Sequence, residues 1–135
     1  MTGALVAVGT LVLATAVGLL LRTRSGRVGA ARTPALPAEV LAALDPTAAV
    51  TLVQFSTTFC APCRHTRALL ADLAERTPGL AHAEIDLTDR ADLARAMAVL
   101  STPTTVAVAG GAEVLRVRGL PRRDALLEAL AEHLR

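Results

Sequence analysis

The spacing of hydrophobic positions changes several times along this chain. Residues 4–21 are apolar and carry no charged side chain, whereas later segments show either short β-branched runs or apolar residues three to four positions apart. The first pattern is typical of a membrane span, the second of buried strands, and the third of amphipathic helices. Strands are predicted at residues 50–55, 81–86, 104–109 and 113–118, and helices at residues 38–44, 61–76, 89–100 and 121–134.

The order of these elements indicates the fold class. Helices and strands alternate until Gly110-Gly111, a hairpin turn signal, joins the last two strands. Alternating strands and helices favour a parallel sheet covered by helices on both faces, to which the final hairpin adds an antiparallel edge. In the helix at 89–100, we expect Leu93, Met97 and Leu100 to share one apolar face. The expectation is an α/β domain with a central mixed sheet.

The apolar run at residues 4–21 is long enough to cross a membrane. At about 1.5 Å per residue it spans about 27 Å as a helix, close to the thickness of a hydrocarbon core. A cleaved signal peptide is the alternative, but no Lys or Arg precedes the run and no Ala-x-Ala follows it before the arginines. We therefore expect a single-pass anchor at residues 1–21.

Four arginines follow this run within a short stretch. Arg22, Arg24, Arg27 and Arg32 occupy a segment with Gly and Pro but no periodicity, which predicts a basic linker at residues 22–37 before a domain at 38–135. A short edge strand near Arg27-Val28 is the alternative for part of this segment. Positive residues tend to stay on the cytoplasmic side, so the domain is expected there, with an extracytoplasmic domain as the alternative. No aromatic residues accompany the arginines, and we expect no nucleic-acid partner.

The chain has two cysteines, which is too few for a disulfide framework. Cys60 and Cys63 lie at the start of the helix predicted from residue 61, where positions i and i+3 share one side. The helix N-terminus favours a thiolate at Cys60, the expected attacking sulfur, and Cys63 is expected to be more buried and to resolve the mixed disulfide. Pro62 fits the first turn, where its missing N–H costs nothing.

The cysteine pair has two other possible interpretations. A zinc site would need four converging ligands, and His65 and His82 lie on another helix face and on another strand. A structural disulfide that closes so short a loop would add little stability. Neither is favoured, so the sequence predicts redox activity with no metal and no cofactor beyond the Cys60–Cys63 disulfide.

Residues 47–134 resemble the thioredoxin family. The similarity lies in the segment LVQFSTTFCAPC, in Ile85-Asp86 at the end of a central strand, in Thr102-Pro103-Thr104 before the hairpin, and in Gly119 after the last strand. The resemblance implies a thioredoxin-like three-layer sandwich in which Pro103 is cis and lies against the cysteines. It also implies that the Thr102 backbone can pair with a substrate strand. The implied substrate-binding residues are Phe59, Ala61, Pro62, Thr102, Pro103 and Gly119.

The chain departs from the family pattern at three positions. Gln54 stands where the family has a buried acid that assists the resolving thiol, and His82 stands near the position of the lysine that pairs with that acid. Phe59 replaces a common Trp and offers a smaller platform to substrates. Because Gln54 cannot accept a proton, any transfer through the region of Gln54 and His82 would have to run differently.

These features together predict a thiol–disulfide oxidoreductase that reduces protein disulfides. Pro62 before the second cysteine resembles the reducing members of the family, and a cytoplasmic domain would agree with that direction. The expected partners are protein disulfides, an upstream electron donor, and the membrane through residues 4–21. An extracytoplasmic oxidoreductase for protein maturation, such as cytochrome assembly, and a non-catalytic binding or scaffold protein are the alternatives.

Overall fold

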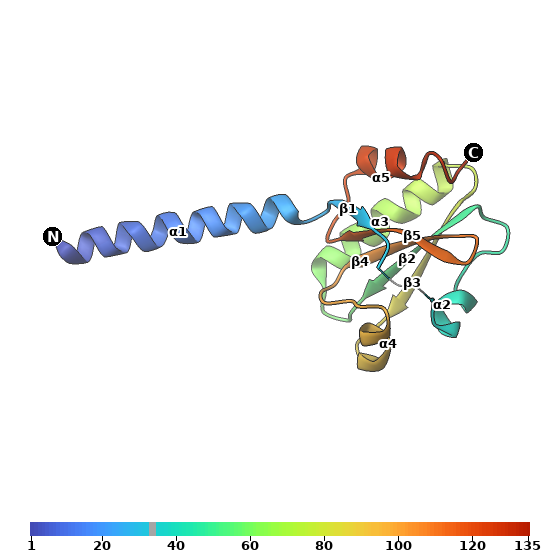
Figure 1. The fold of residues 1–135 in the computed structure, drawn as a ribbon, viewed down its shortest axis with the longest axis horizontal. Coiled ribbons are helices and arrows are strands. Elements are labelled where there is room, and N and C mark those ends of the chain that lie inside the picture. The colour runs from blue at the N-terminus through green and yellow to red at the C-terminus, as the bar shows by residue number, and fades with distance from the viewer. Residues whose placement is uncertain (33–34) are drawn as a thin grey trace.

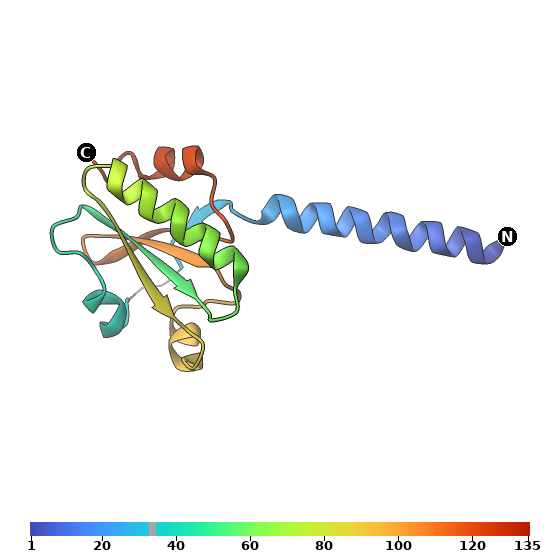
Figure 2. The same cartoon turned by 180° about the vertical axis from the view of Figure 1, so that it is seen from behind.

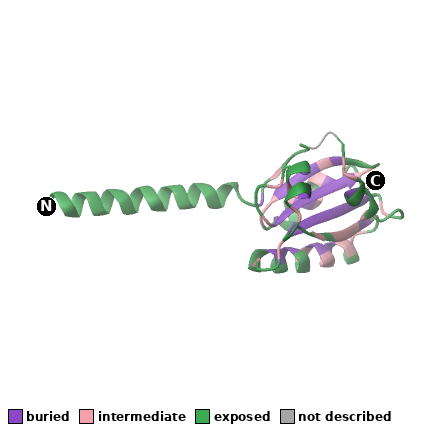
Figure 3. Ribbon diagram, turned by 90° about the horizontal axis from the view of Figure 1, so that it is seen from below, coloured by how far each residue is buried: buried purple, intermediate pink, exposed green. Residues whose placement is uncertain are grey.

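The computed structural model describes residues 1–32 and 35–135, and its N-terminal helix stands apart from the rest of the chain. Helix α1 (Thr2–Arg24) extends away from the folded domain (Figure 1) and none of its residues is buried (Figure 3). It is long and apolar enough to cross a membrane, a test that a signal sequence also passes. The residues of the predicted span therefore form one continuous helix.

The domain is built around a five-stranded sheet with the order β1-β5-β4-β2-β3. Strand β2 pairs in parallel with β3, whereas the pairs β2–β4, β4–β5 and β5–β1 are antiparallel. The strands are β1 (Val28–Ala30), β2 (Val50–Ser56), β3 (Leu80–Asp86), β4 (Thr104–Ala109) and β5 (Ala112–Arg118). The alternative of a short edge strand near Arg27-Val28 is therefore correct, and this strand is β1.

Helices cover both faces of this sheet, as Figures 1 and 2 show from opposite sides. The helices of the domain are α2 (Ala38–Ala42), α3 (Ala61–Arg76), α4 (Ala91–Ala96) and α5 (Arg123–Leu130). Along β2, Leu52 packs with α3 and α5, whereas Val53 and Phe55 pack with α2 and α4. This alternation follows from the two-residue period of a strand, and it divides the core into two layers. It also turns Gln54 toward α3.

Two details of the predicted arrangement are wrong. The hairpin of β4 and β5 was expected at one edge of the sheet, but β4 lies at its centre and β3 and β1 form the edges. The helix predicted at 89–100 ends at Ala96, and Ala98 then takes a positive φ of 51°. Leu100 therefore leaves the apolar face of Leu93 and Met97, and its side chain is 81% exposed. The helical spacing of apolar residues in the sequence thus continues to Leu100, although the helix itself ends at Ala96.

Candidate functional site

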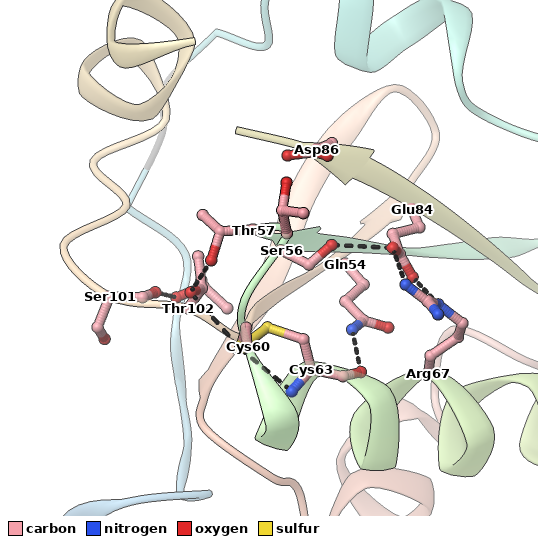
Figure 4. The surroundings of a disulfide bond; sticks show 12 residues. Gln54, Ser56, Thr57, Cys60, Cys63, Arg67, Glu84, Asp86, Ser101 and Thr102 are labelled. Atoms are coloured by element: carbon pink, nitrogen blue, oxygen red, sulfur yellow. Dashed lines mark hydrogen bonds and ion pairs between the residues drawn. A yellow bond between two sulfur atoms is a disulfide. The ribbon is translucent and has the colours of Figure 1, made fainter. Parts of the chain in front are cut away.

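The two cysteines lie where β2 passes into α3, at one end of the sheet. Cys60 is the N-cap of α3, and Cys63 lies one turn further along the helix. Their sulfurs form a disulfide with the Cα atoms 5.2 Å apart (Figure 4). The loop of residues 57–59 and Pro62 in the first turn allow the helix to start at Ala61, where the sequence predicts it.

The two sulfurs of this disulfide differ in their access to solvent. Cys63 is 1% exposed, whereas Cys60 is partly exposed and is followed by exposed Ala61 and Pro62. The Cys60 Sγ accepts a hydrogen bond from the backbone N–H of Cys63 at 3.2 Å. Unpaired N–H groups at a helix N-terminus favour negative charge, so a thiolate formed at Cys60 would be stabilised there. An incoming group can reach Cys60 more easily than Cys63.

A second segment approaches the disulfide from the loop before β4. The Thr102–Pro103 peptide bond is cis, Pro103 is buried, and the Thr102 hydroxyl donates to the Cys60 Sγ at 3.7 Å. Gly119 follows β5 and donates its N–H to the Pro103 carbonyl at 2.8 Å. The structure thus brings the cis-proline loop to Cys60 through Thr102, and brings Gly119 to Pro103.

Gln54 lies beneath the first turn of α3 and is fully buried. Its Nε2 donates to the Cys63 carbonyl at 2.8 Å, and its Oε1 lies 3.1 Å from the Nε2 of His82. The Oε1 is an acceptor, so His82 donates in this contact. Burial lowers the pKa of His82, a trend that the charge of nearby Glu84 opposes. Gln54 and His82 therefore lie in hydrogen-bond contact, and Gln54 holds the backbone of Cys63.

Sequence reasoning missed the polar side chains that surround the end of β2. Thr57 lies 3.2 Å from the Thr102 hydroxyl, oxygen to oxygen, and links β2 to the cis-proline loop. Ser56 donates to Glu84 at 2.9 Å, and Glu84 also pairs with Arg67 of α3. This pairing with Arg67 lowers the pKa of Glu84. The only signal in the sequence is the run of hydroxyl residues before Cys60, which has no spacing specific to this role.

Phe59 stands beside the disulfide without packing against the domain. Its side chain is fully exposed, at 100%, and with Thr58, Cys60, Ala61 and Arg64 it lines a shallow cavity of about 280 Å³. In the described part of the chain, no three His, Cys, Asp or Glu side chains lie together as potential metal ligands. The groups that the described structure presents here include the sulfur of Cys60, the hydroxyl of Thr58, the guanidinium of Arg64 and the N-terminus of α3.

Comparison with known proteins identifies the same region. A family model described as thioredoxin matches residues 38–132. A thioredoxin H-type from Fagopyrum esculentum is 33% identical over 82 residues, covering 61% of this chain and 70% of its own length. A thioredoxin from Mycobacterium tuberculosis is 34% identical, covering 60% of this chain and 71% of its own length. A bifunctional thioredoxin reductase/thioredoxin from Mycobacterium leprae is 34% identical over 60% of this chain, which corresponds to 18% of that protein.

The folds agree as well. The structure of a mutant thioredoxin from Halobacterium salinarum superposes with a TM-score of 0.64 at 29% identity, covering 77% of this chain and 96% of its own. The family match spans most of the chain and includes both cysteines of the disulfide. The chain therefore belongs to the thioredoxin family and is a thiol–disulfide oxidoreductase.

Proposed function

We propose that this protein is a membrane-anchored reductase of protein disulfides. The observation that carries the proposal is the unequal exposure of the two sulfurs: Cys60 is accessible at the N-terminus of α3, and Cys63 is buried behind it. The accessible sulfur of Cys60 can attack a partner's disulfide. The buried sulfur of Cys63 cannot reach that disulfide itself, but it can attack the resulting mixed disulfide at Cys60 and so release the partner. This division of roles is what dithiol exchange requires.

The proposed cycle balances in two steps. The Cys60 thiolate attacks one sulfur of a substrate disulfide, a mixed disulfide forms, and the other substrate sulfur leaves as a thiolate that takes up a proton. The Cys63 thiol then loses its proton and attacks the Sγ of Cys60, which releases the second substrate thiol and forms the Cys60–Cys63 disulfide. Two electrons pass to the substrate, and the cycle uses no bound cofactor. Phe59, Ala61, Pro62, Thr102, Pro103 and Gly119 are the proposed contacts of the substrate.

The reducing direction is supported by Pro62 and by one relative. Proline before the second cysteine resembles the reducing members of the family. The relative from Mycobacterium leprae joins a thioredoxin to a thioredoxin reductase in one chain. We propose that an electron donor of that class restores the Cys60–Cys63 dithiol here.

The proposed location combines α1 with the arginines that follow it. Helix α1 is the proposed single-pass anchor, and its last turn contains Arg22 and Arg24, with Arg27 shortly after. Positive residues next to a span favour the cytoplasmic side, so we place the domain there. A reducing compartment would keep the dithiol available for substrates.

The full chain in detergent micelles tests the activity. With a thioredoxin reductase and NADPH as the electron source, it should reduce insulin, and Cys60→Ser should abolish turnover. Cys63→Ser should also lose turnover yet hold substrates as mixed disulfides on Cys60. A reduction potential near −270 mV, as in thioredoxin, would agree with a reductase, whereas a value near −120 mV would indicate an oxidant. No insulin reduction by the native chain would instead favour a binding protein.

Labelling tests the location separately. A membrane-impermeant thiol reagent added to intact cells after reduction should leave Cys60 unmodified, and it should modify Cys60 once the cells are opened. Modification in intact cells would contradict the cytoplasmic placement and favour the extracytoplasmic oxidoreductase.

A further inference from the structure

The connection between α1 and the sheet is short and is held in place. Only residues 25–27 separate the end of α1 from β1, and β1 already pairs with β5 from Val28 onward. Gly26 is buried, has a φ of 74°, and donates its N–H to the Arg118 carbonyl at 2.5 Å. A Cβ at Gly26 would lie 2.3 Å from the Leu120 carbonyl oxygen. The domain is therefore attached to the anchor without a free tether.

This attachment places the redox site on the side of the domain from which α1 extends. Figures 1 and 2 show, from opposite sides, that the first turn of α3 lies on that side. A cavity of about 570 Å³ is lined by Leu21 and Arg24 of α1, by its C-cap Ser25, and by the site residues Pro62, Thr102 and Pro103. A substrate segment lying beside Thr102 in this cavity would also lie against the last turn of α1.

The position of this cavity can be related to the bilayer. Leu21 ends the uncharged run that would occupy the hydrocarbon core, and the headgroup layer beyond it is only about 5–8 Å thick. A cavity that Leu21 itself lines therefore begins at the boundary of the hydrocarbon. A large soluble protein approaching Cys60 on this side would have to displace headgroups, whereas a segment emerging from the membrane already lies among them.

The loops around the disulfide carry exposed apolar side chains. Phe59 is 100% exposed, Leu100 is 81% exposed and Leu120 is 48% exposed. Phe59 precedes Cys60, Leu120 follows Gly119, and Leu100 lies two residues before Thr102. Among the described residues after α1, Leu41 is the one other large hydrophobic side chain that is exposed. Apolar groups are favourable in the interfacial layer, and the neighbouring Arg22 and Arg24 complement anionic headgroups. The face around the disulfide thus fits a bilayer surface.

We propose that the substrates are disulfides in the juxtamembrane segments of other membrane proteins, within a few residues of the point where those chains leave the bilayer. This inference rests on the proposed reductase function and on α1 as the anchor. The chemistry is the exchange already described: the substrate disulfide gains two electrons and two protons, and the Cys60–Cys63 dithiol is oxidised to the disulfide. The new element is the position of the substrate, which the anchor and the site define together.

The test compares two probes in liposomes that contain the full chain, reduced beforehand and followed through a single turnover. Both probes are synthetic single-span peptides with one intramolecular disulfide. In the near probe the disulfide begins about three residues beyond the apolar segment, and in the far probe about twenty residues beyond it, after a Gly/Ser spacer. We expect the near probe to be reduced at least about tenfold faster, because both partners are confined to the same layer.

A spacer variant provides the matched control. An insertion of about fifteen Gly/Ser residues between Arg24 and Ser25 keeps residues 25–135 intact but frees the domain from the surface. It should lose the preference for the near probe and reduce soluble insulin at least as fast as the native chain. Equal rates on both probes by the native chain, or a preference that survives the insertion, would overturn the inference. Failure of both chains on insulin and on both probes would instead contradict the proposed reductase.

Discussion

A buried ion pair between Glu113 and Arg116 joins three parts of the molecule and offers a quantitative test of the fold. Their side chains are 0% and 2% exposed, and the Arg116 Nε lies 2.8 Å from a Glu113 carboxylate oxygen. The Arg116 Nη1 also donates to the Met97 carbonyl at 2.6 Å, and the same Glu113 oxygen accepts the Arg32 N–H at 3.0 Å. The pair thus connects β5 to the end of α4 and to the segment after β1.

We expect Arg116→Met to lower the free energy of unfolding by about 3–5 kcal/mol. Methionine keeps much of the apolar length but leaves the Glu113 carboxylate buried without this partner, and breaking a buried pair in this way costs about that much. A domain of this size is stable by only about 5–15 kcal/mol. At about 4–8 °C per kcal/mol, the thermal midpoint should fall by at least about 12 °C.

Far-UV circular dichroism of the full chain in detergent is the suitable assay, because the chain has no Trp or Tyr. Glu113→Leu combined with Arg116→Met should cost less than Arg116→Met alone, because no buried carboxylate is left behind. Arg76→Met removes the exposed pair with Asp72 and should change stability by less than about 1 kcal/mol. A loss below about 1 kcal/mol for Arg116→Met, or a double variant as costly as the sum of the two singles, would refute the reasoning.

Three further predictions concern the surroundings of the disulfide. Gly119→Ala should destabilise the domain by about 1–3 kcal/mol, since φ is 75° and the new Cβ would lie 2.2 Å from the Ser25 Oγ. Gly110→Ala is the control: φ is also positive there, but a new Cβ would have no atom within 4 Å, so thermal unfolding followed by circular dichroism should show a smaller loss of stability. Burial lowers the pKa of His82, so the unfolded chain binds more protons at this group than the folded chain does. The contribution of His82 to stability is therefore present above pH about 6.5 and is lost as the pH falls toward the lowered pKa. In urea unfolding between pH 7 and 5, the free energy of unfolding should depend less on pH for His82→Gln than for the native chain. In stopped-flow measurements, the rate at which Cys63 resolves a mixed disulfide on Cys60 should depend on pH through a single ionisation, since Gln54 does not titrate. Gln54→Glu should add a second inflection to this pH–rate profile, above the usual carboxyl range. An unchanged pH–rate profile would show that the side chain at position 54 does not influence the reaction of Cys63.

The sequence predicts the chemistry of the site better than its surroundings. The cysteine spacing and the strand before it locate Cys60 at a helix N-terminus and Cys63 one turn inside, because both consequences are local. The resemblance to thioredoxins adds Pro103 and Gly119, which lie far along the chain. Neither source predicts the contact of Gln54 with the Cys63 carbonyl, because hydrophobic periodicity reports which face of a strand is buried and not which atoms it meets.

The errors in the predicted fold have a similar origin. Leu100 continues the spacing of Leu93 and Met97, yet the chain leaves the helix at Ala98, and the spacing alone carries no information about that exit. The hairpin was predicted correctly as a hairpin, but its place at the centre of the sheet depends on pairing between β2 and β4, distant segments that carry no mutual signal. The short distance between α1 and the site likewise could not be predicted from the sequence, because it depends on how closely Gly26 and Gly119 pack against neighbouring residues.

Strand β1 has a practical consequence for where this domain can be cut. The family match begins at residue 38, but β1 at Val28–Ala30 covers the outer edge of β5 through pairing with residues 115–117. A chain shortened to the matched region would expose those backbone groups as an open edge, which is a template for pairing with another molecule. Such a fragment is expected to self-associate where a chain beginning near Ser25 would remain monomeric. We therefore expect the smallest fragment that stays monomeric to start next to the anchor, ahead of the family boundary.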